Sequence, residues 1–242
     1  MLGACSAPAE APPAAVPAVA SAPTPAALPR EAAPAEPSPP PAAPAGFHVE
    51  RRALTAPEKA AMVGVSWHEG CPLGLDALVR LELRHRTPTG PDATGVLVVA
   101  ATAAPVVERA FARMYAAGFP IVRMEPIEAF GGDDEASMAV NNTSAFNCRA
   151  RYGGKDFSRH AWGEAIDVNP LWNPLVKADA AAPGGVRVAP ESGRPWSDRT
   201  RVEPGSLQAG SEAVRAFTDE GWGWGGTWRS LKDWQHFSAD GR

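Results

Sequence analysis

The folded part of the chain begins with alternating apolar and charged residues. In residues 79–85, apolar side chains at 79, 81 and 83 alternate with charged side chains at 80, 82 and 84, which is the period-two pattern of a half-buried strand. Turn-forming residues over 87–92 lead into a second apolar run at 95–99. The two runs therefore predict a β-hairpin.

Helical periodicity follows the hairpin. Apolar residues between 106 and 114 recur at helical spacing and predict a helix over 105–117 that ends at Gly118. Thr55 and Ser211 are suited to cap two shorter helices. Further strands are expected at 119–124, 144–148, 163–168 and 234–237, and a loop rich in Pro, Gly and Arg is expected over 177–206. This order predicts an α+β fold with a small central antiparallel sheet flanked by helices.

Composition divides the chain in two. Residues 1–46 contain 17 Ala and 13 Pro, half of the 26 prolines, and no aromatic residue. Such a tract buries too little apolar surface to offset the entropy of ordering it. We therefore expect a disordered Pro/Ala-rich linker over 1–46 and one folded domain over 47–242.

The charge and hydropathy of the chain exclude some classes of partner. A formal net charge of −4 gives no reason to expect a nucleic-acid partner, which would need a basic face. No run of 18 apolar residues exists to span a membrane. Nothing in the sequence indicates an oligomer, so a monomer is assumed.

The first six residues, Met-Leu-Gly-Ala-Cys-Ser, resemble the lipobox of bacterial lipoproteins, in which Cys5 would carry a lipid anchor. No basic or apolar region precedes this motif, in contrast to a complete signal peptide. We expect a cell-envelope location, with membrane contact only through an anchor at Cys5. If Cys5 is lipidated, Cys71 and Cys148 are left either as one disulfide or as two buried thiols.

Two histidines and an aspartate suggest chemistry. His160, Asp167 and His236 together offer two imidazoles and one carboxylate, the ligand set of a catalytic zinc ion (Zn2+) that keeps one position open for water. A nearby carboxylate is needed to move the proton, and Asp233 is the natural candidate. Glu164 and Glu220 are the alternative bases.

The motifs around these residues resemble the VanY-type zinc D-alanyl-D-alanine carboxypeptidases and their endolysin relatives. Ser-x-His-x-x-Gly-x-Ala-x-Asp spans 158–167 and Asp-x-x-His-Phe spans 233–237, and residues 141–149, 166–170 and 221–226 are also similar to one branch of that family. The resemblance extends over about residues 65–238.

Carried over to this chain, the family implies that zinc is bound by His160, Asp167 and His236 and that Asp233 is the general base. Ser158 would hold the substrate. Arg149 would stabilise the oxyanion or the substrate carboxylate, although it lies closer to the first histidine than in the commoner family pattern. The zinc site is expected in a cleft on the sheet.

Two further features left alternatives open. Asp233 and His236 would point to opposite faces of a regular strand, so Asp233 is expected on a turn that enters it. Trp224 and its glycine-spaced neighbours Trp222 and Trp228 would either line a peptide cleft or belong to the core.

The residues and the resemblance together predict zinc-dependent hydrolysis of a peptide bond in peptidoglycan stem peptides, most simply removal of the terminal D-Ala. An endopeptidase that cuts an L-Ala-D-Glu bond or a cross-link is the first alternative. A non-catalytic lipoprotein that binds the cell wall is the second.

Overall fold

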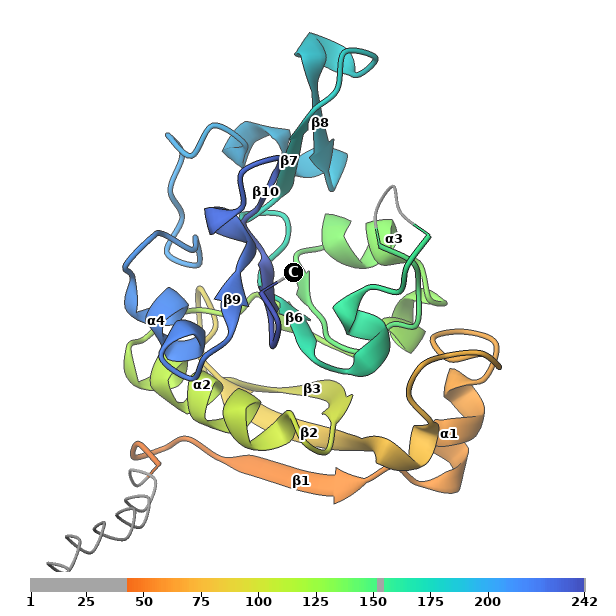
Figure 1. Ribbon diagram of the computed structural model, residues 1–242. Helices are drawn as coiled ribbons and strands as arrows, with labels where there is room; N and C mark the ends of the chain where they lie inside the picture. The colour runs from red at the N-terminus through yellow and green to blue at the C-terminus, as the bar shows by residue number, and fades with distance from the viewer. Residues whose placement is uncertain (1–42, 152–154, 242) are drawn as a thin grey trace, which may run out of the picture. The chain divides into compact units, whose positions relative to one another are not determined.

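The computed structural model describes residues 43–151 and 155–241 (Figure 1). Residues 1–42 of the predicted linker, together with the lipobox-like motif at Cys5, lie outside the described residues, so the disorder and the anchor stay predictions. None of the helices in the described ranges is long and apolar enough to cross a membrane.

Helices and small antiparallel sheets make up the described chain, which confirms the α+β class (Figure 1). The expectation of one central sheet is wrong. The described residues contain three separate three-stranded antiparallel sheets and one parallel pair of strands. Most of these strands are two to five residues long, so no single sheet forms the centre.

The first sheet has the order β1-β2-β3, with β1 at Val49–Ala53, β2 at Leu78–His85 and β3 at Ala93–Ala100. Strands β2 and β3 form the predicted hairpin, paired over their full length from Leu78 opposite Ala100. Leu81 and Leu83 are fully buried, as their alternation with charged residues predicts.

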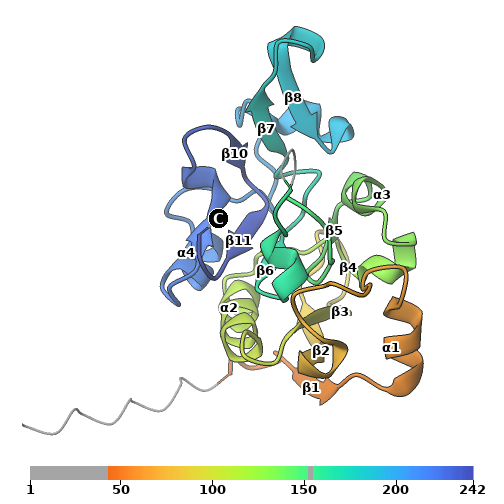
Figure 2. The same cartoon turned by 45° about the vertical axis from the view of Figure 1, so that its right-hand side comes forward.

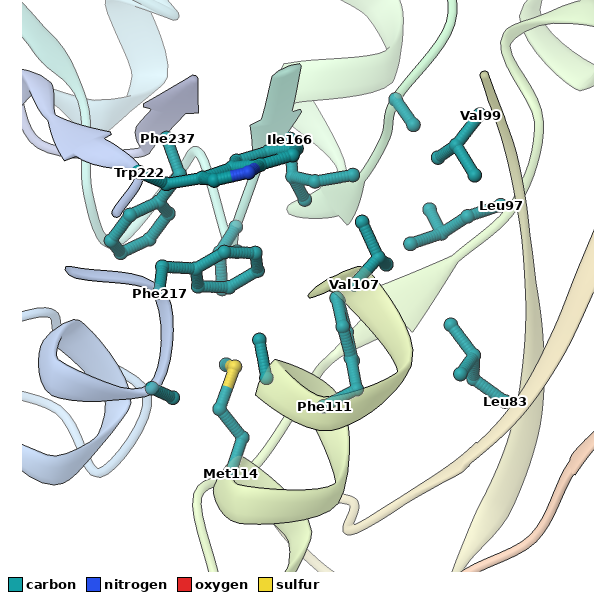
Figure 3. Packing of buried hydrophobic residues seen from close by; sticks show 14 of the residues in the cluster. Leu83, Leu97, Val99, Val107, Phe111, Met114, Ile166, Phe217, Trp222 and Phe237 are labelled. Atoms are coloured by element: carbon teal, nitrogen blue, oxygen red, sulfur yellow. The ribbon is translucent and has the colours of Figure 1, made fainter. Parts of the chain in front are cut away.

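Helices α2 (Ala104–Ala116) and α4 (Glu212–Thr218) contribute to the main core. Figure 3 shows Phe111 and Phe217 side by side, with the ring of Phe237 next to that of Phe217. The ring centroids are 6.0 Å apart in the first pair and 4.4 Å in the second. Since Phe237 follows His236 directly, this core fixes the strand that carries a candidate ligand.

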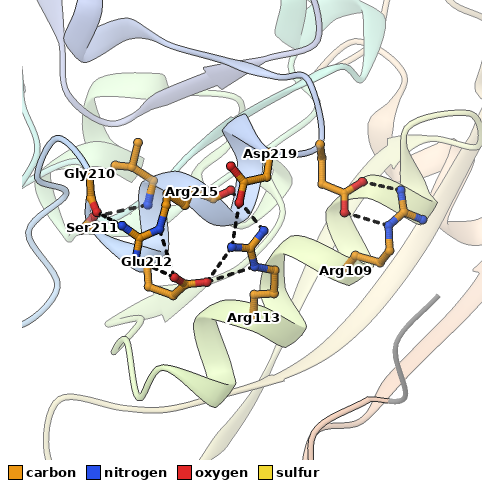
Figure 4. A network of polar contacts seen from close by, with 9 residues as sticks. Arg109, Arg113, Gly210, Ser211, Glu212, Arg215 and Asp219 are labelled. Atoms are coloured by element: carbon orange, nitrogen blue, oxygen red, sulfur yellow. Dashed lines mark hydrogen bonds and ion pairs between the residues drawn. The ribbon is translucent and has the colours of Figure 1, made fainter.

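Ion pairs join the exposed sides of α2 and α4 (Figure 4). Arg113 contacts Glu212 at 2.7 Å and Asp219 at 3.0 Å, and Arg109 binds Glu220 at 2.6 Å. Glu220 is therefore part of this helix contact, which removes the reason to consider it as a base.

Two further sheets lie nearer the candidate site. One has the order β6-β11-β9, with β6 at Ala165–Asp167, β11 at His236–Ser238 and β9 at Gly223–Trp224. The other has the order β10-β7-β8, with bounds Lys232–Asp233, Leu175–Ala178 and Val186–Ala189. Figure 2 shows β7 and β8 as a hairpin that projects from the remainder of the domain.

Shorter elements complete the fold. They are α1 (Ala56–Met62), α3 (Asp134–Ala139), the parallel strands β4 (Arg123–Met124) and β5 (Asn142–Thr143), and 3-10 turns at Leu75–Ala77, Ile127–Phe130, Arg159–Trp162, Pro183–Gly185, Glu191–Trp196 and Gly225–Thr227. Helix α1 begins at a capping box of Thr55 and Glu58, and Ser211 caps α4, as expected.

Three sequence-based assignments need correction. The expected loop over 177–206 contains most of the β7–β8 hairpin. The expected strand over 119–124 is reduced to β4, because its earlier amides bind Arg86 O and the Asn169 side chain instead of a strand. The expected strand over 144–148 contains only a single bridge, from Ser144 to Asp167.

A disulfide joins Cys71 to Cys148, which decides between the two alternatives left by the sequence. The Cys148 amide also donates to Ser66 O at 2.8 Å. Both contacts fix the backbone directly before Arg149.

Candidate metal site and active-site cavity

Strand pairing brings two of the three predicted ligands together. In the antiparallel pair β6–β11, His236 lies opposite Asp167, and residues that face each other in such a pair have close side chains. His236 Nδ1 is 3.0 Å from Asp167 Oδ1. A short piece of sheet therefore brings together two residues that are 69 positions apart in the chain.

The third ligand comes from the 3-10 turn Arg159–Trp162, which is called η3 here. Ser158 caps this turn, and its Oγ accepts from His160 N at 3.4 Å. His160 Nε2 is 3.1 Å from Asp167 Oδ2 and 3.3 Å from His236 Nδ1. The structure thus places all three predicted ligands in one group.

Gly163 ends η3 in a left-handed conformation, with φ of 64°. A Cβ atom at this position would lie 2.5 Å from Ala100 N. The Ala100 amide also donates to Gly163 O at 2.9 Å. The glycine of the Ser-x-His-x-x-Gly motif therefore permits η3 to pack against the end of β3.

The three-residue group suits a tetrahedral metal ion. Ligand atoms about 2.0–2.1 Å from tetrahedral zinc lie about 3.3 Å from one another, close to the 3.0–3.3 Å found here. His160 Nδ1 lies 2.5 Å from Ala145 O, a contact that places the proton on Nδ1 and leaves Nε2 as an electron-pair donor. These observations fit zinc.

Burial and charge act in opposite directions on Asp167. The side chains of His160, Asp167 and His236 are 3%, 6% and 7% exposed. Burial alone would raise the pKa of Asp167, but the neighbouring imidazoles outweigh it and hold that pKa well below its usual range. The carboxylate is therefore ionised, as a metal ligand must be.

His68, Cys71 and Cys148 form the other close group of metal-ligand residue types within the described ranges. The two cysteines are bonded to each other and so lack the thiolate that binds metals. This group is part of the disulfide region and does not offer a second metal site.

The ligand group opens into a cavity of about 480 Å³. Of the residues to which the sequence analysis gave a first role in metal binding, catalysis or substrate binding, all but Trp224 line it, namely Arg149, Ser158, His160, Asp167, Asp233 and His236. Four apolar residues, Met138, Leu175, Ala189 and Leu231, line it as well and belong to one small cluster. A cavity that is lined by both polar and apolar side chains suits a peptide ligand.

Trp224 is the exception and requires a correction. Its side chain is buried in the main core, and its Nε1 donates to Trp234 O at 2.9 Å. The ring packs so closely on Gly226 that a Cβ there would lie 2.4 Å from it. Trp228 lines the cavity instead. The alternation of tryptophan with glycine does not indicate which tryptophan lines the cavity and which belongs to the core.

Asp233 ends strand β10, where it pairs with Leu175. Residues 234–235 form a turn, and His236 begins the separate strand β11. The break lies after Asp233 and not before it, which corrects the expectation that Asp233 sits on an entering turn. Both side chains can therefore face one cavity despite their spacing of three residues.

The environment of Asp233 is suited to accepting a proton. Burial raises the pKa of its carboxyl group to about 7, while His236 and Arg149 act against this rise. Its Oδ1 is buried without a hydrogen-bond partner among the described residues. Glu164, the alternative base, is paired with Arg159 at 3.1 Å and is absent from the described lining of the cavity.

The sequence does not identify Asp134 as a site residue. This residue begins α3, lines the cavity, and contacts Arg149 through Oδ2 at 2.7 Å from Nη2. In the sequence it looks like a solvated acidic turn between Asp133 and Glu135. No local pattern connects it with an arginine 15 residues away.

A buried pair of imidazoles with a shared carboxylate, beside a second buried carboxyl group in a cavity, is an arrangement that can bind a catalytic metal ion and supply a base beside it. The model of a family described as D-alanyl-D-alanine carboxypeptidase matches residues 152–239. The match supports, for this segment, the resemblance to the VanY-type family. No curated protein and no solved structure matches the chain.

The matched segment contains the three candidate ligands and Asp233. Arg149 and Asp134 precede it, so their place at the cavity depends on the structure alone.

Proposed function

We propose that the protein is a zinc-dependent peptidase that hydrolyses a peptide bond in peptidoglycan stem peptides. The observation that carries this proposal is the grouping of His160, Asp167 and His236 within 3.0–3.3 Å in a cavity that also contains Asp233. Removal of the terminal D-Ala is the reaction that the family match favours. Cleavage within the stem or a cross-link is the alternative.

His160 Nε2, His236 Nδ1 and an Asp167 oxygen would hold the metal ion. Zinc in such a site supplies an acidified water and polarises the carbonyl group under attack. Asp233 accepts a proton from the attacking water and returns it to the leaving amine nitrogen. Arg149 places a positive charge at the cavity, where it can stabilise the carbonyl oxygen or bind a substrate carboxylate.

Ser158 supports the site in two ways. Its Oγ caps η3 and so orients His160, and the residue also lines the cavity, where it can contact the peptide. The cluster of apolar residues in the cavity lining suits the small apolar side chains of a stem peptide. The predicted cell-envelope location fits this substrate.

The test is mass spectrometry of a muropeptide mixture with pentapeptide stems and cross-linked dimers, incubated with the full chain. It is performed with zinc, with a chelator, and with His160→Ala in place of the wild type. His48→Ala changes an exposed histidine and serves as the control. We expect zinc-dependent cleavage that His160→Ala abolishes and His48→Ala retains.

The products separate the reactions. Loss of only the terminal D-Ala identifies a carboxypeptidase, whereas dimer collapse or stem scission identifies an endopeptidase. Stoichiometric zinc binding without any cleavage would contradict the proposal and favour a wall-binding protein.

A further inference from the structure

Arg149 already has an acidic partner inside the cavity. Its Nη2 lies 2.7 Å from Asp134 Oδ2, and the two side chains are 29% and 26% exposed. Both residues line the cavity that contains the candidate metal ligands. Asp134 therefore contributes a carboxylate at the place where a substrate carboxylate would meet this arginine.

Arg151 is the second arginine on the described lining of the cavity. Its Nη2 lies 2.9 Å from Asp156 Oδ2. Each arginine that lines the described cavity is thus paired with a carboxylate of the chain itself. Neither is a vacant receptor for the carboxylate at the end of a peptide.

A guanidinium holds a carboxylate most strongly when two parallel N–H groups contact its two oxygens. In a guanidinium the two parallel N–H groups belong either to Nε and Nη2 or to Nη1 and Nη2. Nη2 is therefore needed in both arrangements. Asp134 contacts Nη2, and Nε is buried without a hydrogen-bond partner in the described residues. A substrate carboxylate must displace Asp134 or accept a guanidinium whose charge is already balanced.

A peptide that continues beyond the scissile bond meets a different situation. It presents a neutral amide instead of a carboxylate at this position and does not compete with Asp134. The ion pair can then remain in place while the peptide is bound. The pair therefore discriminates between the two kinds of substrate.

We propose that Asp134 is a specificity-determining residue that competes with the substrate's terminal carboxylate for Arg149. It shifts the preference of the peptidase away from free C-terminal carboxylates and toward peptides that continue past the cleaved bond. The inference rests on the proposed function, since it concerns the same cavity, and within that function it favours cleavage inside a stem or cross-link over removal of the terminal D-Ala. It adds a residue that lies outside the matched segment.

The test compares two substrates, acetyl-L-Lys-D-Ala-D-Ala and the same peptide with a C-terminal amide. Full-length, zinc-loaded wild type and Asp134→Asn are assayed with both. We expect Asp134→Asn to lower KM for the free carboxylate roughly tenfold, because a charge-assisted contact becomes available. Values of KM for the amide and of kcat for both peptides should change less than twofold.

Two variants provide controls. Asp133→Asn removes the same charge one residue away, and asparagine retains the helix cap that Asp133 supplies to Ala136 N. Asp134→Glu retains the charge at the position itself. Both variants should show the wild-type ratio between the two peptides.

Equal effects of Asp134→Asn on both peptides would show a merely structural role and overturn the proposal. An unchanged KM ratio would overturn it as well.

A second measurement is independent of turnover. The two peptides are titrated calorimetrically into zinc-loaded Asp233→Asn, with and without Asp134→Asn. A selective gain in affinity for the free carboxylate supports the role of Asp134 even if no hydrolysis is found. Equal affinities in both backgrounds overturn it, whatever the fate of the proposed function.

Discussion

His236 and Asp167 lie directly opposite each other on the antiparallel strands β11 and β6, with His236 Nδ1 3.0 Å from Asp167 Oδ1. Strand register therefore determines their distance, and one backbone ladder fixes both ligands. Phe237, the next residue, is fully buried against Phe217. Because side chains alternate along a strand, burial of Phe237 on one face directs His236 to the other.

Asp233→Asn should retain zinc and lose activity. The variant keeps the shape of the side chain but cannot accept a proton, so kcat should fall by roughly 10²–10⁴. Metal content is measured by atomic absorption and turnover by release of the cleaved peptide. Glu164→Gln is the matched control, because it removes a carboxylate that is paired with Arg159, and it should stay within about twofold of wild type. Wild-type turnover in Asp233→Asn would show that another group is the base.

The sequence predicts long periodic elements and local motifs well. The β2–β3 hairpin and helix α2 have enough residues for their periodicity to be read. The Ser-x-His-x-x-Gly-x-Ala-x-Asp motif can likewise be recognised in the sequence, because its cap, its left-handed glycine and two of the ligands all lie within residues 158–167.

Elements that depend on distant contacts could not be predicted. Strands of two residues such as β4 and β10 have no period to recognise. The pairing of Asp134 with Arg149, like the burial of Trp224, arises from how separate segments pack. The β7–β8 hairpin was hidden by the Pro, Gly and Arg residues that surround it.

Loss of the disulfide should destabilise the domain. Cys71 and Cys148 are 77 residues apart, and closing a loop of this length stabilises the folded state by about 4 kcal/mol in the chain-entropy model. We expect the double variant Cys71→Ser/Cys148→Ser to lose about 2–5 kcal/mol of unfolding free energy in guanidinium titrations. Dithiothreitol should reproduce the loss in wild type and leave the double variant unchanged. Equal stability of oxidised and reduced wild type would contradict a stabilising bond.

His85 should make the stability of the domain depend on pH. Burial lowers the pKa of this imidazole below its usual range, although the Arg86 and Ile121 carbonyl groups oppose the shift. As pH falls below about 6.5, the unfolded chain binds a proton that the folded chain resists. The unfolding free energy should therefore fall with decreasing pH, by up to about 1.4 kcal/mol per pH unit from this residue.

Denaturant titrations between pH 7.5 and 5.5 should show that the unfolding free energy of His85→Gln depends less steeply on pH than that of the wild type, while His48→Gln should follow the wild type. Identical pH dependence in His85→Gln and wild type would exclude this contribution.

Gly163→Ala tests how tightly η3 must pack on β3. Gly163 and Gly184 have almost the same backbone conformation, with φ of 64° and 66°. An added Cβ at Gly163 would lie 2.5 Å from Ala100 N, whereas at Gly184 it would meet nothing within 4 Å. Both alanine variants carry the strain of a left-handed residue, about 1–2 kcal/mol, but only Gly163→Ala must also move backbone. We expect it to lose at least about 2 kcal/mol more in chemical unfolding than Gly184→Ala, and to bind zinc more weakly because His160 lies on the displaced turn. Equal stability and zinc affinity in the two variants would mean that η3 is not held by this contact.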